Sequence, residues 1–505
     1  MDSLENLKKR IEFKNLNNVF RTLTVLLFIS YAQLTTSQER TSFTTNGREV
    51  NIENFNAEVN QMVDDIGISG LSLAIIEDNK VVFNHFYGNE IASNDKKIND
   101  QTVFEAASLT KMYLVYVVHQ LVDSGKIDLD KPIYQYRIHK DLEHDPRYKL
   151  ITPRMILSHS SGIENWSWNN NKEVLEIVSD PGEKFVYSGE GFEYLAKVVE
   201  QILDEPYEDY VNTRILKPLK LQNTYLKYKK GEENPLASES PSNYANGYDV
   251  FGEKVNKWKN YRTIPASGAH TTGEDYGQFL TYFFKEGNLS KERIQDLVKP
   301  IVPVGDGKYP LHMGAGFFMI MNDGNQIASF SGNNTGFKAE LFYSVTEKRG
   351  FVFFTNNDHG KLITKALNKL SVNFNIDFLF EDSFFKQYPS TALSIQKIYR
   401  EEKSVDKVLA ELEKIKSEGN LTENTLNELG ELFKNKEPEL SMKLLKENIK
   451  LFPENPNQYG LLASMYLNNK DYKSAYDYFL KAKELQFELW NVEAELTYCK
   501  EKIID

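Results

Sequence analysis

Hydrophobic and polar residues alternate in two neighbouring segments of the chain, Gly70–Ile76 and Val81–Tyr87, which are separated by Asp78-Asn79. Period-two patterns on either side of a polar turn predict an antiparallel β-hairpin. A block of helical patterns follows this hairpin, with an apolar stripe through Val115, Val118 and Leu121. Further strands are predicted at Ala315–Met321, Gln326–Phe330, Phe337–Tyr343 and Gly350–Phe354, followed by a helix over 361–372. Strands, then helices, then strands predict an α+β fold in which helices sandwich an antiparallel sheet.

The pattern changes after Glu381-Asp382-Ser383, where glycine becomes rare, lysine and glutamate increase, and the strand patterns stop. From about residue 394 the chain is predicted to form pairs of helices. Leu426–Phe433 is similar to Tyr459–Tyr466, 33 residues later, and this period resembles that of tetratricopeptide repeats. About three units over 394–505 would build an all-α repeat domain. The repeats either offer a concave surface to a protein or peptide partner or only support the preceding domain.

The first 32 residues have the layout of a secretory signal peptide. Basic residues, among them Lys8, Lys9 and Arg21, precede the short apolar run Leu23–Ala32, which ends in a small residue at the expected cleavage position. We therefore expect export to the periplasm or the exterior of a bacterium, with residues 33–50 as a linker and 51–380 as the main domain. The alternative is an uncleaved segment that anchors the protein to the membrane.

Composition narrows the classes of partner. The net charge of −12 argues against nucleic acid or an anionic membrane surface as the main partner. A single cysteine, Cys499, excludes an internal disulfide. With 505 residues, of which 41% are hydrophobic, the chain is long enough for about three domains with ordinary cores.

The most informative chemical motif is Ser108-Leu109-Thr110-Lys111 at the start of a predicted helix. Residues three apart lie on one helix face. A lysine held neutral by burial could therefore take the proton of the serine hydroxyl and make it a nucleophile. The same spacing recurs elsewhere, as at Ser394 and Lys397, so the motif is weak without further support.

Support comes from segments that follow in order, and with them the chain over about 51–370 resembles the serine β-lactamase and penicillin-binding-protein superfamily. The resemblance is strongest to its class C-like branch of esterases, D-aminopeptidases and carboxypeptidases. The segments are Gly125–Ile133, the "LL-x-H-x-SG"-like stretch Ile151–Gly162 and the turn Pro265–Asp275. The resemblance implies an antiparallel sheet packed by helices beside a helical subdomain, with the active site in the cleft between them.

The resemblance also implies further site residues. Tyr187 stands at the family's Y-x-N motif and would exchange protons with Lys111, whereas Gly189 replaces the asparagine. The third motif falls at Phe330-Ser331-Gly332-Asn333. Gly332 would let the substrate approach the strand, Ser331 would contact the substrate, and the Asn333 amide would join the Ser108 amide as an oxyanion hole. An apolar ring at Phe330 replaces the family's cation or imidazole.

His159, in the "LL-x-H-x-SG"-like stretch, is expected to fix a loop rather than to perform chemistry. Trp166 and Trp168 are candidates for the wall of an acyl pocket. His139 and His144 lie five residues apart and match no metal-binding spacing. We therefore expect neither a metal nor another cofactor.

Together these features predict an exported serine hydrolase that forms an acyl-enzyme with small esters, amides or peptides. Phe330 removes an anchor for a carboxylate-bearing peptide or β-lactam and so favours an esterase or amidase. Two alternatives stay open: a β-lactamase or D-alanine carboxypeptidase, and a catalytically impaired binding protein that recruits a partner through its repeats.

Overall fold

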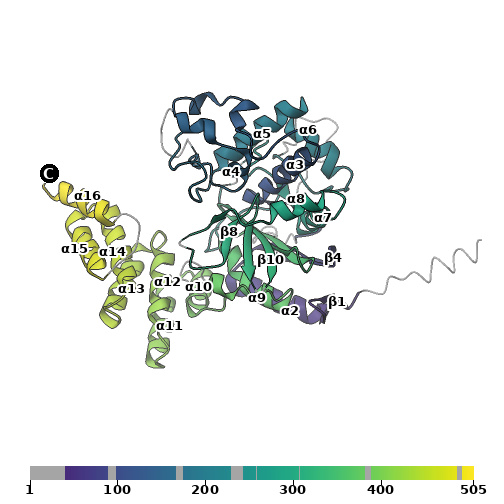
Figure 1. The fold of residues 1–505 in the computed structure, drawn as a ribbon. Coiled ribbons are helices and arrows are strands. Elements are labelled where there is room, and N and C mark those ends of the chain that lie inside the picture. Colours follow the sequence, from purple (N-terminus) through teal and green to yellow (C-terminus); the bar gives the residue numbers. More distant parts are fainter. Residues whose placement is uncertain are drawn as a thin grey trace, which may run out of the picture.

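The computed structural model describes residues 40–88, 98–166, 174–228, 243–256, 259–305, 307–322, 324–380, 388–485 and 492–504. Its centre is an eight-stranded antiparallel sheet with the strand order β4-β3-β12-β11-β10-β9-β8-β7 (Figure 1). The strands are β3 (Gly70–Glu77), β4 (Lys80–Gly88), β7 (Val302–Pro303), β8 (Leu311–Met313), β9 (Phe318–Asn322), β10 (Asn325–Asn334), β11 (Phe337–Ser344) and β12 (Arg349–Thr355). The predicted α+β fold is therefore confirmed, whereas the expected signal peptide over 1–32 lies outside the described residues.

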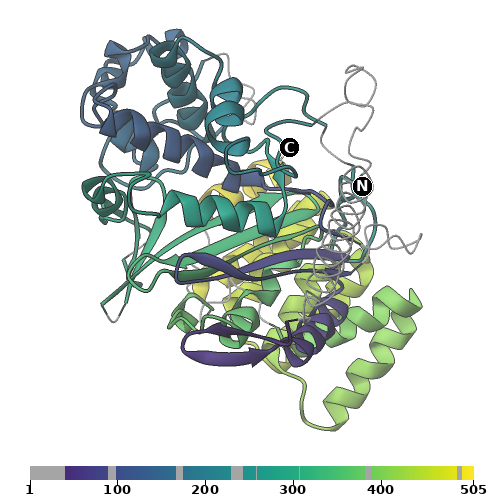
Figure 2. The same ribbon diagram turned by 90° about the vertical axis from the view of Figure 1, so that its right-hand side faces the viewer.

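The first predicted hairpin forms as expected, because β3 and β4 pair across a turn in which Asp78 and Asn79 have φ angles of 49° and 55°. Alternate residues of β3 bury on opposite faces of the sheet. Leu71, Leu73 and Ile75 pack with α2 (Ile52–Ile66) and α9 (Thr364–Leu370), which follows the 3₁₀ turn η7 (Gly360–Ile363). Ala74 and Ile76 pack toward α7 (Gly273–Phe283) on the other face. The sheet is thus covered by helices on both sides (Figure 2).

The linker predicted over 33–50 is partly wrong, because β1 (Ser42–Thr45) and β2 (Arg48–Asn51) form a hairpin. Phe43 is buried in the core, with its ring 4.7 Å from that of Phe83. Four-residue strands made mostly of polar side chains carry little periodic signal, and one buried phenylalanine ties them to the domain. The main domain therefore begins before residue 51.

A helical subdomain lies on the α7 side of the sheet (Figure 1). Its longest helices are α3 (Lys111–Asp123) and α5 (Gly189–Leu203), and α3 is buried along almost its whole length. A helix that is apolar on all sides is expected to lie inside a protein. The shorter helices are α4 (Pro153–Leu157), α6 (Tyr207–Val211) and α8 (Lys291–Leu297). No helix among the described residues has the length and the apolar run that a bilayer crossing needs.

The C-terminal region is all helical, as predicted, and comprises α10 (Thr391–Glu402), α11 (Val405–Ser417), α12 (Glu423–Phe433), α13 (Pro438–Leu451), α14 (Pro456–Asn468), α15 (Tyr472–Glu484) and α16 (Val492–Ile504). Helices α12 and α14 begin 33 residues apart, in agreement with the repeat period. The first helix begins at Thr391, because Ser390 caps it by accepting a hydrogen bond from the Leu393 amide, so the boundary lies three residues before 394.

This region is fixed to the main domain. Lys397 of α10 forms ion pairs with Asp64 and Asp65 at 2.5 and 2.8 Å. Phe251, from a loop of the main domain, packs its ring against those of Tyr399 and Phe433, 5.5 Å from each, and these two rings also contact each other at 5.0 Å. The helices extend from there away from the sheet (Figure 1).

Candidate active site

Ser108 lies in a constrained turn. The short strand β5 (Phe104–Glu105) pairs with β6 (His270–Thr271) and leads into the 3₁₀ turn η1 (Ala107–Thr110), which continues as α3. Ala107 has a φ of 46°, which a residue other than glycine adopts only when its surroundings hold it there. The Thr110 hydroxyl provides one such restraint, because it donates to the Ala107 carbonyl at 2.6 Å. The backbone on either side of Ser108 is therefore preorganised.

The structure brings Ser108, Lys111 and Tyr187 together. The Tyr187 hydroxyl donates to Ser108 Oγ at 2.7 Å, and Lys111 Nζ lies 3.4 Å from the same oxygen. Nζ also lies 4.9 Å from the centre of the Tyr187 ring. Lys111 is completely buried, whereas Ser108 is partly exposed. The buried Lys111 side chain and the Tyr187 hydroxyl thus both contact the partly exposed hydroxyl of Ser108.

His159 holds the loop that carries Tyr187, in line with the expectation for this residue. Its ring stacks on that of Tyr187 at 4.2 Å, and its Nδ1 accepts a hydrogen bond from the Ser188 amide at 3.1 Å. Burial and the charge of Lys111 hold the pKa of His159 well below its usual range. The imidazole is therefore neutral and adds no charge beside the phenol.

Glu193 is a site residue that sequence reasoning missed. Its carboxylate accepts a hydrogen bond from the Ala266 amide at 3.0 Å, and the Ala266 carbonyl accepts one from Lys111 Nζ at 2.8 Å. Burial raises the pKa of Glu193 to about 7, against the opposing effects of the Ala266 hydrogen bond and the Lys111 charge. The available signal was a charged residue between Phe192 and Tyr194, both of which are buried.

Strand β10 passes close to the Ser108 turn at Gly332. A Cβ atom at this position would lie 2.5 Å from the Ala106 carbonyl oxygen, so only glycine permits the approach. Strand β9 pairs with β10 only as far as Ser329, which leaves Phe330–Asn334 with a strand partner on the β11 side alone. Asn334 Nδ2 donates to Glu105 at 2.8 Å and ties the end of this strand to β5. The amide of Asn333 lies on this segment.

The side chain of Ser331 contacts Lys361 rather than Ser108, and its expected contact with the substrate stays a prediction. Side chains alternate along a strand, and Ser331 pairs in register with Glu340 on the sheet face that α2 and α9 cover. Its hydroxyl accepts a hydrogen bond from Lys361 Nζ at 2.5 Å. Position 330 carries no cation, but the fold places the ammonium group of Lys361 beside the neighbouring residue Ser331, which lies 30 positions earlier in the chain.

Phe330 is buried, as an apolar residue should be, with its ring 5.3 Å from that of Phe318. At the other departure from the family motif, a Cβ on Gly189 would lie 2.3 Å from the indole of Trp166. The indole therefore occupies the space that the asparagine side chain would need. Trp168 lies outside the described residues.

Comparison with known proteins shows the family to which the chain belongs. The family model for Beta-lactamase matches residues 55–373, more than half of the chain. Protein flp of Staphylococcus aureus is 21% identical over 371 residues, which cover 68% of each chain. Two solved structures share the fold: an octameric penicillin-binding protein homologue from Pyrococcus abyssi (TM-score 0.55, 20% identity, covering 65% of this chain and 80% of that one) and a class C beta-lactamase (0.53, 18%, 63% and 95%). The chain belongs to the beta-lactamase family of serine hydrolases and carries an all-helical region after the family's domain.

Proposed function

We propose that the protein is an exported esterase or amidase that forms an acyl-enzyme on Ser108. The observation that carries this proposal is the placement of Ser108 Oγ, 2.7 Å from the Tyr187 hydroxyl and 3.4 Å from Lys111 Nζ. A serine hydroxyl becomes a strong nucleophile only when a neighbouring group removes its proton. Two groups stand within reach of that proton.

In the proposed reaction, Ser108 Oγ attacks the carbonyl carbon of an ester or amide, and its proton passes to the Lys111–Tyr187 pair. These two groups share the proton, so neither is assigned alone as the base. The amides of Ser108 and Asn333 stabilise the oxyanion of the tetrahedral intermediate. The same pair then protonates the leaving group, and a water molecule later hydrolyses the acyl-enzyme by the reverse proton path.

Covalent labelling tests the proposal. A fluorophosphonate should modify the wild-type protein, and the variant Ser108→Ala should not be labelled. Ser394→Ala is the matched control, because Ser394 and Lys397 have the same spacing on α10 but Lys397 pairs with Asp64 and Asp65. Labelling that persists in Ser108→Ala would refute the assignment of the nucleophile.

The reaction type is tested by substrates. We expect p-nitrophenyl esters of short acids to be hydrolysed faster than nitrocefin or D-amino-acid anilides, because Phe330 replaces the cation of the family's third motif. Rapid cleavage of nitrocefin or of the anilides would instead identify a β-lactamase or a carboxypeptidase.

A binding protein that has lost its chemistry is the second candidate. Phe330 and the Trp166 indole beside Gly189 favour it, since both fill space that polar groups of the family motifs would use. It predicts a folded protein without Ser108-dependent labelling, whose function would depend on a partner bound by the helices after residue 391.

A further inference from the structure

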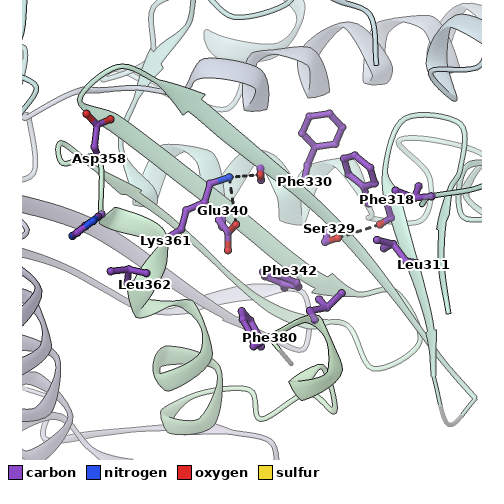
Figure 3. Close-up of a pocket in the computed structure, with 14 residues that line it drawn as sticks. Leu311, Phe318, Ser329, Phe330, Glu340, Phe342, Asp358, Lys361, Leu362 and Phe380 are labelled. Carbon is purple, nitrogen blue, oxygen red and sulfur yellow. Dashed lines mark hydrogen bonds and ion pairs between the residues drawn. The ribbon is translucent and has the colours of Figure 1, made fainter. Parts of the chain in front are cut away.

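Lys111 is completely buried, and the groups that contact its Nζ in the described part of the chain are uncharged. Nζ lies 2.8 Å from the Ala266 carbonyl oxygen and 3.4 Å from Ser108 Oγ. Lys361 provides a contrast, because it points toward Glu340 and its Nζ lies 3.7 Å from a carboxylate oxygen (Figure 3). The charge of Lys111 therefore depends on carboxylates that do not contact it directly.

Glu193 is such a carboxylate, and a single residue connects it to Lys111. The Glu193 carboxylate accepts a hydrogen bond from the Ala266 amide at 3.0 Å, and the Ala266 carbonyl accepts one from Lys111 Nζ at 2.8 Å. Burial raises the pKa of Glu193, whereas the Ala266 hydrogen bond and the charge of Lys111 oppose the effect of burial. Coupling between two titrating groups is mutual. The ionisation of Glu193 must in turn favour the ammonium form of Lys111.

The turn that carries Ala266 is fixed on both sides. Before it, the Thr263 hydroxyl donates to Glu208 at 2.5 Å, and after it, the Ala269 amide donates to the Thr110 hydroxyl at 3.0 Å. Ala266 itself is completely buried. A buried amide needs an acceptor, because leaving it unpaired is costly. By accepting this hydrogen bond, Glu193 helps to hold the carbonyl group that positions Lys111.

Other titratable groups surround this pair of side chains. They are Tyr187 and His159 on loops, Glu190 and Lys197 on α5, and Tyr207 on α6. Burial keeps His159 and Tyr207 neutral, because it holds the pKa of the imidazole well below and that of the phenol well above its usual range. Glu190 raises and Lys197 lowers the pKa of Glu193, and Lys111 affects it more strongly than either. Lys111 is therefore the group whose charge is most closely coupled to that of Glu193.

We propose that Glu193 is a positioning residue of the acylation step, which holds Lys111 toward Ser108 through Ala266 and controls the pH range in which Lys111 acts as a base. The inference rests on the proposed function and deepens it by naming a residue that regulates the same site. Only the neutral amine can accept the proton of the Ser108 hydroxyl as Oγ bonds to the carbonyl carbon. Because the pKa of Glu193 is about 7, its negative charge at higher pH retains the proton on Lys111 and delays the appearance of the free base.

The pH dependence of fluorophosphonate labelling tests this role in the full-length protein. In this reaction Ser108 Oγ bonds to phosphorus, fluoride leaves, and the hydroxyl proton passes to the Lys111–Tyr187 pair. Glu193→Gln keeps an oxygen that accepts the Ala266 hydrogen bond but cannot ionise. Its labelling rate should rise at a pH about one unit lower than that of the wild type, which makes it up to about tenfold faster above about pH 7. The two rates should converge at acidic pH, where the wild-type carboxyl group is protonated.

A second variant separates the hydrogen bond from the charge. Glu193→Met has a similar volume but offers the Ala266 amide no oxygen, so its labelling should be about tenfold slower than that of Glu193→Gln at every pH. Glu183→Gln is the control, because Glu183 is an exposed carboxylate in the loop before Tyr187, and it should reproduce the wild-type profile. Thermal unfolding checks that each variant is folded, and Glu193→Gln decides the test if Glu193→Met is not.

The charge of Lys111 provides a readout that does not depend on catalysis. In protein labelled with lysine that carries ¹³C at Cε, the resonance that disappears in Lys111→Arg reports this charge. It should titrate at a lower pH in Glu193→Gln than in the wild type. An unshifted titration, or a labelling profile of Glu193→Gln that superimposes on that of the wild type, would overturn the inference.

The two proposals fail in different ways. Absent labelling of the wild type together with a shifted titration of Lys111 in Glu193→Gln would refute the catalytic proposal alone. Ser108-dependent labelling that follows the same pH profile in the wild type and in Glu193→Gln would refute the role of Glu193 alone.

Discussion

Replacing Glu193 by glutamine should change how the stability of the protein depends on pH. Burial raises the pKa of this carboxyl group from 4.5 to about 7 in the folded protein. The folded state therefore favours the protonated form, and the unfolded chain ionises at lower pH. The contribution of the Glu193 carboxyl group to the free energy of unfolding is fully present below pH 4.5 and is lost as the pH rises through about 7.

The magnitude follows from the two pKa values. At about 1.4 kcal/mol per pH unit, the difference between 4.5 and about 7 lowers the free energy of unfolding at pH 8 by about 3 kcal/mol. Glu193→Gln keeps an oxygen that accepts the Ala266 amide hydrogen bond but cannot ionise. The variant should match the wild type near pH 4.5 and exceed it in stability by about 3 kcal/mol at pH 8.

Urea denaturation of both proteins between pH 4.5 and pH 8, followed by tryptophan fluorescence, measures this difference. Glu183→Gln serves as the control, because Glu183 is an exposed carboxylate in the loop before Tyr187. It should leave the wild-type pH profile unchanged. Parallel pH profiles for wild type and Glu193→Gln would show that the carboxyl group is not held in the buried environment described above.

Three further predictions concern the site and its support. Tyr187→Phe should slow fluorophosphonate labelling of Ser108 by about 10²-fold or more, with an unchanged melting temperature, and an undiminished rate would remove the phenol from the proton path. Gly189→Asn should be destabilised by contact with the Trp166 indole, and adding Trp166→Ala should recover most of the lost melting temperature; equal effects of the single and double changes would contradict this. Phe251→Ala should lower the free energy of unfolding by about 3 kcal/mol and expose the C-terminal helices to limited proteolysis, whereas wild-type resistance would show that this ring does not hold them.

The amino-acid sequence determined the features that depend on neighbouring residues. The period-two pattern of Gly70–Ile76 and Val81–Tyr87 predicted the hairpin β3–β4, because alternating residues along a strand indicate which of its two faces is buried. The pair Ser108 and Lys111 was predictable for the same reason, since a spacing of three places both on one side of a helical turn. The offset between α12 and α14 was visible as a repeat of 33 residues.

The family motifs made it possible to predict Tyr187 as well, although it lies 79 residues from Ser108 along the chain. The two side chains are in contact in the structure. The motifs gave no information about residues outside them. Glu193 looked like one of many helical glutamates until its carboxylate was seen to meet the Ala266 amide. Lys361, which donates a hydrogen bond to the Ser331 hydroxyl, likewise carried no signal of its own in the sequence.

Only the tertiary structure decided these contacts, for a physical reason. A backbone angle such as the φ of 46° at Ala107, or the indole of Trp166 in the space beside Gly189, is imposed by groups that are distant along the chain. Periodicity records which side of an element is buried, but not which other element covers it. The sequence therefore determined most of the elements and the local pair of Ser108 and Lys111, and packing determined which charges and rings surround this pair.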